Sequence, residues 1–204
     1  MTRTTNRFVV ALLSATLLAL PAAAESLRND VLFLLPRESG EVGFIDLGEL
    51  RSSPHYLLIK RRMLPRRFAQ FERFVRSTGV NVDKDVDWLA WVLVPPGPER
   101  PGELFLGVAQ GQFSPESVEE FFERQKLPID AYRGQTLFPF GSGVGAREFL
   151  FTFLDSSTAA FGTRSSLELL LETRFGGNEN LLSNEILFDH LNEVNGKAPV
   201  WVVL

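Results

Sequence analysis

The sequence predicts an α+β fold, with a largely antiparallel sheet of about seven or eight strands and helices packed mainly on one face. Short apolar segments alternate with amphipathic ones, and several predicted strands follow one another too closely for a helical crossover. In addition, Phe149, Phe151 and Phe153 alternate on one side of a strand whose other side is also mostly apolar. Such a strand belongs in the middle of a sheet covered on both faces.

The predicted strands are short apolar runs bounded by polar, glycine or proline residues. The first two flank a polar turn, which is typical of a hairpin, and a proline-rich loop at residues 95–102 separates the third from the fourth. The last run ends the sequence, so we expect it either to pair inside the sheet or to belong to a domain truncated at its C-terminal end. The predicted strands are residues 31–36, 42–47, 88–94, 104–110, 136–140, 148–154, 158–163 and 200–204.

Amphipathic segments between these strands are predicted helices. Pro65 begins the clearest one, because Phe68, Phe71 and Val75 fall on one face at helical spacing. Another begins at Ser114, where a capping hydroxyl is followed by proline and an acid. The others are residues 50–63, as one helix or as two divided near Pro54, a segment with Leu167, Leu170 and Leu171 as its apolar stripe, and a segment that Ser183 caps, with Leu187, Leu191 and Val194 as its stripe.

Residues 1–24 are predicted to be a secretory signal peptide. Arg3 and Arg7 precede an uncharged apolar run at residues 8–20, and Ala22-Ala-Ala24 supplies the small residues of a cleavage site. The run would form roughly 20 Å of helix, which is shorter than the ~30 Å core of a bilayer. We therefore expect cleavage near Ala24, and a retained membrane anchor is the alternative. The mature chain, residues 25–204, would be a single α+β domain in the periplasm or outside the cell that does not span the membrane.

Composition narrows the function classes. The chain has no cysteine, so it forms no disulfide and carries no lipoprotein anchor, and its core must supply the stability. The formal net charge of −4 becomes −6 when Arg3 and Arg7 leave with the signal. A mildly acidic domain has no general attraction for nucleic acid, and we predict no nucleic-acid partner. We also predict no cofactor.

Two segments have the composition of ligand loops without the full motif. Asp83, Asp85 and Asp87 alternate as in a calcium loop, but Trp88 and Val94 stand where that loop needs glycine and glutamate. We interpret the segment as a solvated turn that leads into a strand. Residues 141–145 are rich in glycine, but a strand follows where a nucleotide loop would open onto a helix, so we interpret them as a hairpin connection.

No catalytic or metal-ligating residue is predicted. The two histidines, His55 and His190, are far apart in sequence, and a zinc site would depend on carboxylates. No Gly-x-Ser-x-Gly nucleophile elbow is present. A site built on paired carboxylates has no local signature, and that alternative stays open.

A basic cluster gives the candidate binding surface. On the helix from Pro65, Arg66, Arg73 and Arg76 lie on one side, opposite the apolar face. Arginine forks suit carboxylate and phosphate groups. These three residues therefore predict contact with an acidic envelope protein, an acidic polymer or a lipid headgroup. The alternative interpretation is a solvated helix face that pairs with the chain's own acids.

The aromatic residues are strongly biased, with 18 Phe against two Tyr and three Trp. Phenylalanine supplies apolar area without a hydrogen-bonding group. This bias is compatible with a packed core that lacks disulfides. It is also compatible with a cavity for an apolar ligand.

Several short motifs resemble domains of unknown function in secreted bacterial proteins. The resemblance covers most of residues 30–204 and implies no activity, cofactor or catalytic residue. The motifs are Phe44-Ile-Asp-Leu, Thr78-Gly79 with Asp83 and Asp85-Val-Asp87-Trp88, Gln110-Gly-Gln-Phe113, Tyr132-Arg-Gly134 and Ala198-Pro-Val-Trp201.

These observations lead to one principal hypothesis and two alternatives. The principal hypothesis is a secreted, non-catalytic binding or scaffolding domain of the bacterial cell envelope. The first alternative is a carrier of an apolar ligand such as a lipid. The second is an enzyme, a hydrolase with a carboxylate-based site.

Overall fold

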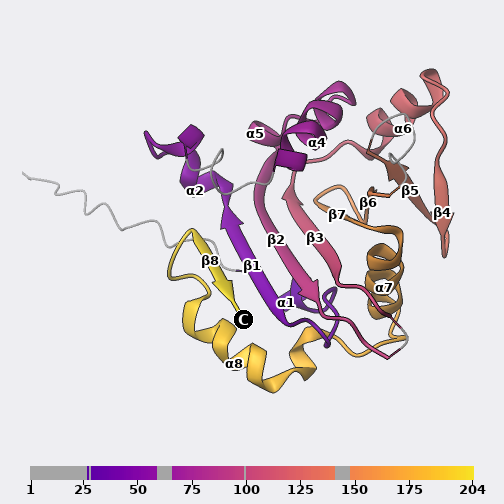
Figure 1. Cartoon of the computed structure of the whole chain (residues 1–204). Coiled ribbons are helices and arrows are strands. Elements are labelled where there is room, and N and C mark those ends of the chain that lie inside the picture. Colours follow the sequence, from indigo (N-terminus) through magenta and orange to yellow (C-terminus); the bar gives the residue numbers. More distant parts are fainter. Residues whose placement is uncertain (1–26, 28, 59–65, 99, 141–147) are drawn as a thin grey trace, which may run out of the picture.

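An antiparallel sheet is the central element of the fold (Figure 1). The computed structural model describes residue 27 and residues 29–58, 66–98, 100–140 and 148–204, and within residues 66–71 it describes the helix without the side chains. The predicted signal peptide and the glycine-rich residues 141–145 therefore lie outside the described residues.

Eight strands form this sheet in the order β4-β5-β6-β7-β3-β2-β1-β8, and every neighbouring pair is antiparallel. The predicted α+β class and the predicted number of strands are confirmed. The last predicted strand pairs with the first strand of the sheet, with Val203 opposite Val42. The strands are β1 (Glu41–Asp46), β2 (Val86–Val94), β3 (Leu104–Gly111), β4 (Asp130–Tyr132), β5 (Gln135–Pro139), β6 (Leu150–Phe153), β7 (Thr158–Gly162) and β8 (Val200–Val203).

Helices pack against both faces of the sheet. The first face carries α1, α7 and α8, and the second carries α2, α4, α5 and α6. The sequence predicted helices mainly on one face, and the structure adds the second group, which gathers at one end of the strands (Figure 1). The helices are α1 (Asn29–Leu32), α2 (Leu47–Arg51), α4 (Arg66–Ser77), α5 (Val82–Asp85), α6 (Pro115–Arg124), α7 (Arg164–Arg174), the 3-10 turn η1 (Leu181–Ser183) and α8 (Glu185–Val194).

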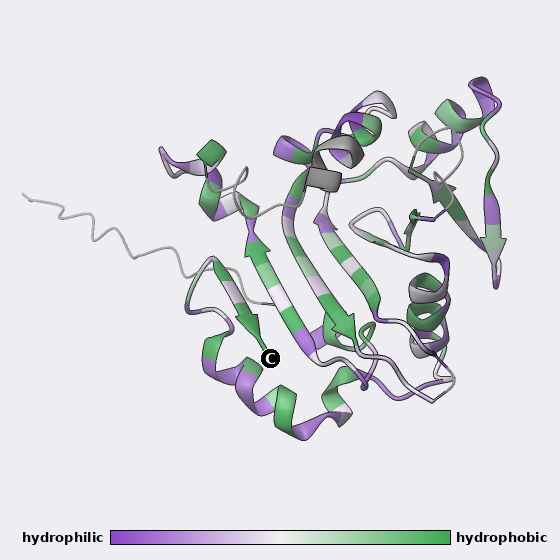
Figure 2. Ribbon diagram, viewed as in Figure 1, coloured by the Kyte–Doolittle hydropathy of each residue, from purple (hydrophilic) through white to green (hydrophobic). Residues whose placement is uncertain are grey.

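Hydropathy follows this arrangement. Figure 2 shows largely hydrophobic strands in the middle of the sheet and helices with alternating hydrophobic and hydrophilic turns. On the first face Phe44 lies between Trp88 and Trp201, with ring centroids 5.6 and 5.4 Å away. Burying an aromatic side chain of this kind stabilises the fold by about 1.5–3 kcal/mol. No helix in the described ranges has both the length and the apolar character needed to cross a membrane.

The second face is built from phenylalanine. The Phe122 ring of α6 lies 4.9 Å from the Phe138 ring and 6.2 Å from the Phe151 ring, both on the sheet. Phe74 joins α4 to this cluster through Phe122, at 6.0 Å. The apolar residues on each face form a core, the first core on the first face and the second core on the second. The alternation predicted for residues 149–154 is confirmed, because Phe151 and Phe153 enter the second core while Leu150 and Leu154 enter the first. These rings therefore fix α4 and α6 over the sheet.

The first predicted strand is wrong, because residues 29–32 form α1. The backbone N–H of Phe33 donates to the carbonyl of Asn29 at 3.0 Å, which closes a helical turn. Val31, Leu32 and Leu35 are 1%, 2% and 0% exposed. Their spacing places all three on one side of a helical segment, whereas a strand would turn neighbouring residues to opposite faces.

Helix boundaries differ from the predictions where a capping residue was misjudged. Of the helix predicted at residues 50–63, the first piece begins at Leu47, because the Asp46 carboxylate accepts from the Glu49 N–H at 2.7 Å, and ends at Arg51. Residues 56–58 are helical again, and residues 59–63 lie outside the described residues. Ser114 precedes α6 but makes no side-chain cap. The last helix is capped by Asn184 rather than Ser183, with its side chain accepting from the Leu187 N–H at 3.2 Å.

A hairpin at the edge of the sheet is tied to α7. Arg133 and Gly134 turn the chain between β4 and β5 with φ of 49° and 78°. The Tyr132 hydroxyl donates to the Glu172 carboxylate at 2.5 Å, and Arg133 donates to the same carboxylate at 2.6 and 2.8 Å. These contacts hold β4, a short strand that the sequence did not predict, against a helix that packs on the first face.

Candidate functional site

Helix α4 carries all three arginines predicted to contact a partner. Val75 is turned inward and is 7% exposed, whereas Arg73 and Arg76 are exposed. Arg66 is the first residue of α4, and its side chain lies outside the described residues. The predicted amphipathic helix is therefore present, and its described arginines lie on its outer side. A partner contact through these residues stays a prediction.

The outer side of α4 is linked to acids of the same chain. The Arg76 guanidinium donates to Glu72 at 3.2 Å, one turn earlier in α4, and to Asp83 of α5 at 3.4 Å. Exposed pairs of this kind are each worth about 0–1 kcal/mol. Arg76 therefore contributes to the contact between α4 and α5, as the alternative interpretation of the basic cluster expected for the chain's own acids.

The three alternating aspartates have separate structural roles. Asp83 accepts from Arg76 and also from the Tyr56 hydroxyl, at 2.6 Å. Asp85 accepts from the Asn81 N–H at 2.6 Å, and Asp87 is exposed on β2. Among the described residues, no group of three acidic, histidine or cysteine side chains could hold a metal ion. Asp83 and Asp85 therefore stabilise the turn around α5 and its contacts with neighbouring segments.

Tyr56 lies in the segment after α2 and joins that segment to α5. Its ring packs against the second core, and its hydroxyl donates to Asp83. Burial raises the pKa of Tyr56, and the hydrogen bond to the Asp83 carboxylate raises it further. The hydroxyl therefore stays protonated, and stays a donor, throughout the physiological pH range.

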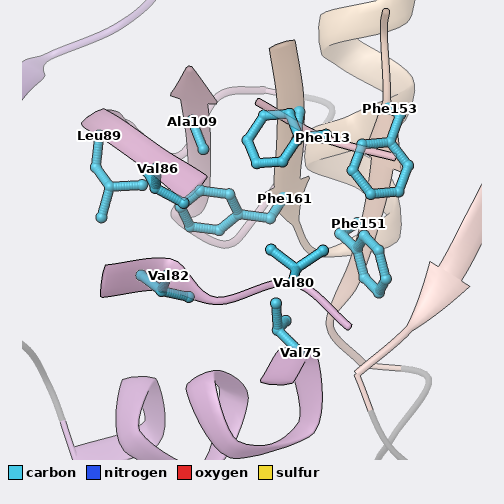
Figure 3. Close-up of a pocket in the computed structure, with 11 residues that line it drawn as sticks. Val75, Val80, Val82, Val86, Leu89, Ala109, Phe113, Phe151, Phe153 and Phe161 are labelled. Atoms are coloured by element: carbon cyan, nitrogen blue, oxygen red, sulfur yellow. The ribbon is translucent and has the colours of Figure 1, made fainter. Parts of the chain in front are cut away.

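An apolar pocket lies between the α4–α5 segment and the second face of the sheet (Figure 3). Its enclosed volume is about 40 Å³, and the empty space is about 480 Å³ when the adjoining space open to solvent is included. Every lining residue is apolar. They are Val75, Val80, Val82, Val86, Leu89, Ala109, Phe113, Phe151, Phe153, Ala159 and Phe161.

Residue size explains why this space is not filled. Ala109 of β3 and Ala159 of β7 face each other in register and have short side chains. The valines of α4 and α5 close the pocket from the opposite side, and Phe113 and Phe153, with ring centroids 5.6 Å apart, form part of its wall (Figure 3). The two alanines on the sheet lie opposite the valines of α4 and α5, and the space that these small side chains leave is surrounded by phenylalanine rings. The sequence signal for it was the excess of phenylalanine, which did not show where the hollow would lie.

A second, polar groove lies between α6 and the β4–β5 hairpin. It has about 780 Å³ of empty space including open solvent, and Glu116, Glu119 and Asp155 line it. Burial raises the pKa of Asp155, but hydrogen bonds from Ser157 and Thr158 outweigh burial and lower the pKa below its ordinary value. A carboxyl group that serves as general acid near neutral pH needs a raised pKa instead. Asp155 is therefore not suited to the role of general acid in this groove.

The two histidines lie on different sides of the molecule. His55 is exposed beside Tyr56, on the side of the second core, and His190 is exposed on α8, which packs against the first core. They do not form a common site.

Comparisons with known proteins do not identify a family. No family model matches the chain, and no curated protein matches it. A solved structure titled "Structure of crystal form IV of TP0453" is similar with a TM-score of 0.41 and 9% sequence identity. The match covers 70% of this chain and 51% of that one, so the chain spans about half the length of that structure. A match this distant says nothing about what the protein binds.

Proposed function

We propose that this protein is a non-catalytic binding domain whose ligand is an amphiphile with an apolar chain and an acidic group. The apolar pocket between α4–α5 and the sheet is the single observation that supports this proposal. It combines two of the hypotheses from the sequence, the apolar-ligand carrier and the arginine-bearing surface for a lipid headgroup. An acidic envelope protein or polymer at the arginines would leave the pocket without a role.

The lining of the pocket favours an apolar chain. Ligand sites are mostly apolar clefts of ~300–1,000 Å³. The enclosed part of this pocket is about 40 Å³, far below that range, so an apolar chain enters only when α4 and α5 move outward. All lining residues are apolar, so the inner part offers no side-chain partner to a polar group, and burying such a group there would cost free energy.

The acidic group of the ligand would meet the outer side of α4. Arg73 and Arg76 are exposed on the helix that contributes Val75 to the pocket, and Arg66 begins the same helix. Guanidinium groups suit carboxylates and phosphates because they donate two parallel hydrogen bonds. Helix α4 would thus contact both the apolar chain and the acidic group of one ligand molecule.

The proposed place of action is the periplasm or the exterior of the cell. Residues 1–24 support it by their charge and apolarity pattern. The intact mass of the protein isolated from each cell fraction identifies its first residue and tests this location. A mature chain that begins at Glu25 in the extracytoplasmic fraction is expected, and an uncleaved chain confined to the cytoplasm would contradict this part of the proposal.

The pocket is tested by filling it. Ala109 is 6% exposed and lines the pocket, so Ala109→Leu places three further carbon atoms in the space that the ligand would occupy. We expect the affinity for a fluorescent long-chain fatty acid to fall at least tenfold, measured by fluorescence titration. Ala131→Leu on the exposed strand β4 is the matched control and should bind as the unchanged protein does.

Two controls make this result decisive. Circular dichroism and urea unfolding show whether Ala109→Leu folds, and Ala159→Leu, which fills the pocket from β7, replaces it if it does not. If a folded, pocket-filled variant binds the fatty acid as well as the unchanged protein, the pocket is not the ligand site and the proposal is wrong.

The head-group contact is tested by charge reversal. Arg73→Glu should weaken binding of the fatty acid severalfold and leave binding of the matching long-chain alcohol unchanged. Arg124→Glu, at the exposed end of α6, is the control for the change in net charge. Equal losses for acid and alcohol, or equal losses for both variants, would exclude a specific contact at Arg73.

A further inference from the structure

The wall of the apolar pocket is held by a polar cluster of which the proposed binding function uses only Arg76. Tyr56, Arg76 and Asp83 come from three different segments: the chain after α2, the end of α4, and α5. The Asp83 carboxylate accepts from Tyr56 on one oxygen, at 2.6 Å, and from Arg76 on the other, at 3.4 Å. A single carboxylate therefore joins all three segments.

Two of these segments carry lining residues of the pocket next to the cluster. Val75 precedes Arg76 in α4, and Val82 precedes Asp83 in α5. Between them, Val80 also lines the pocket. A displacement that widens the pocket on this side moves α4 or α5 away from the sheet, and it strains the contacts of Asp83.

The apolar contacts on this side are incomplete where they border the pocket. Val75, Val80 and Val82 are 7%, 8% and 3% exposed, and their side chains face empty space in the pocket. Side chains beside a void lose part of their dispersion contacts. The hydrogen bond from Tyr56 to the Asp83 carboxylate therefore adds a directional contact on the side of the pocket where the apolar packing is incomplete.

We propose that the Tyr56–Asp83–Arg76 cluster is a latch that keeps α4 and α5 closed over the apolar pocket and must open for a ligand to enter. The latch regulates the site of the proposed function and rests on it. It opens when the Tyr56 hydroxyl and the Arg76 guanidinium leave the Asp83 carboxylate and bind water instead.

Tyr56→Phe is the sharpest perturbation, because it removes the hydroxyl and keeps the ring and the charge of the cluster. The chain offers a matched control. Tyr132 also donates a hydrogen bond to a carboxylate, that of Glu172 on α7, and neither residue lines the pocket. Tyr132→Phe therefore removes an equivalent hydrogen bond without touching the latch.

The test requires no ligand, because the chain has no cysteine and a single thiol can report opening. Ala109→Cys places the thiol in the pocket, and Ala160→Cys places it in the first core, at a fully buried position on β7. The rate of thiol modification by a small maleimide then measures opening of the pocket in the first variant and general unfolding in the second.

We expect Tyr56→Phe to raise the modification rate of the Ala109→Cys thiol about tenfold and to leave the Ala160→Cys thiol unchanged. Tyr132→Phe should leave the Ala109→Cys rate unchanged. If Tyr56→Phe accelerates modification of both thiols, Tyr56 acts on global stability. If it accelerates neither, the Tyr56 hydroxyl does not keep the pocket closed. Each of these two results overturns the latch.

The latch and the proposed function fail in different ways. If the thiol test succeeds and Ala109→Leu still binds the fatty acid normally, the segment opens as proposed but the pocket is not the ligand site. If Ala109→Leu loses binding and Tyr56→Phe does not change the thiol rate, the pocket is the site and its opening does not depend on Tyr56.

Discussion

The close approach of Phe161 to Gly107 gives the most exact prediction. The Phe161 ring of β7 lies over Gly107 of β3, its cross-strand partner, and it also forms part of the pocket wall. A Cβ atom added at Gly107 would lie 2.2 Å from Phe161 Cζ and 2.3 Å from Cε2. Carbon atoms in contact normally lie about 3.5–4.0 Å apart. In Gly107→Ala the ring must therefore move by more than 1 Å, on the order of the difference between these distances.

The expected destabilisation follows from two opposing contributions. Forcing a ring out of a packed position costs about 1–3 kcal/mol. Replacing glycine by alanine also restricts the unfolded chain, which offsets about 0.4–1 kcal/mol. The free energy of unfolding should therefore fall by about 1–2 kcal/mol, or about 2–8 °C in Tm for a chain of this size.

Urea unfolding followed by tryptophan fluorescence measures this change. Gly102→Ala is the control, because a Cβ there would have no neighbour within 4 Å, and it should change stability by less than about 0.5 kcal/mol. Phe161→Leu removes the clashing ring atoms, so Gly107→Ala should cost much less in that background. If Gly107→Ala costs the same in both backgrounds, the ring is not what excludes a side chain at Gly107.

Two further predictions concern the core and the edge hairpin. Phe122 is 1% exposed and contacts Phe138 and Phe151, so Phe122→Ala should reduce the free energy of unfolding by about 3–5 kcal/mol, measured in urea, whereas a loss below 1 kcal/mol would contradict this packing. Hydrogen bonds from Tyr132 and Arg133 lower the pKa of Glu172 below its ordinary value of 4.5. Its stabilisation is therefore complete above that value and is lost as the pH falls through the lowered pKa. Glu172→Gln should reduce the difference in urea midpoint between pH 7 and pH 3, and an unchanged difference would show that the contact is absent in solution.

Elements with strong local patterns could be predicted from the sequence. Helix α4 has apolar residues at helical spacing after a proline, and the strand containing Phe151 has phenylalanine at every second position, so each pattern predicted its element. Helix α1 could not be distinguished from a strand, because a run of apolar residues fits both when it is short. Its helical form depends on burial of Val31, Leu32 and Leu35 together, which is a property of the packed fold.

The candidate site was only partly predictable for a similar reason. The sequence identified the arginine-bearing helix and the unusual aspartates. It could not pair Asp83 with Tyr56, which lies 27 positions away, because hydrogen bonds between distant segments leave no periodic signal. It also could not locate the pocket, because the hollow arises where Ala109 and Ala159 meet across two strands that are distant in sequence.

Arg76 connects the two proposals. Its guanidinium is exposed on the outer side of α4, where the acidic group of a ligand would bind, and it also donates to Glu72 and Asp83. An acidic group that binds Arg76 competes with these carboxylates, because each additional acceptor shares the same donors. Binding of the head group would then weaken the hold of Arg76 on Asp83 and favour release of α5 from α4. An apolar molecule without an acidic group lacks this effect. It should therefore enter the pocket more slowly than the matching acid, and rapid-mixing fluorescence measures this difference.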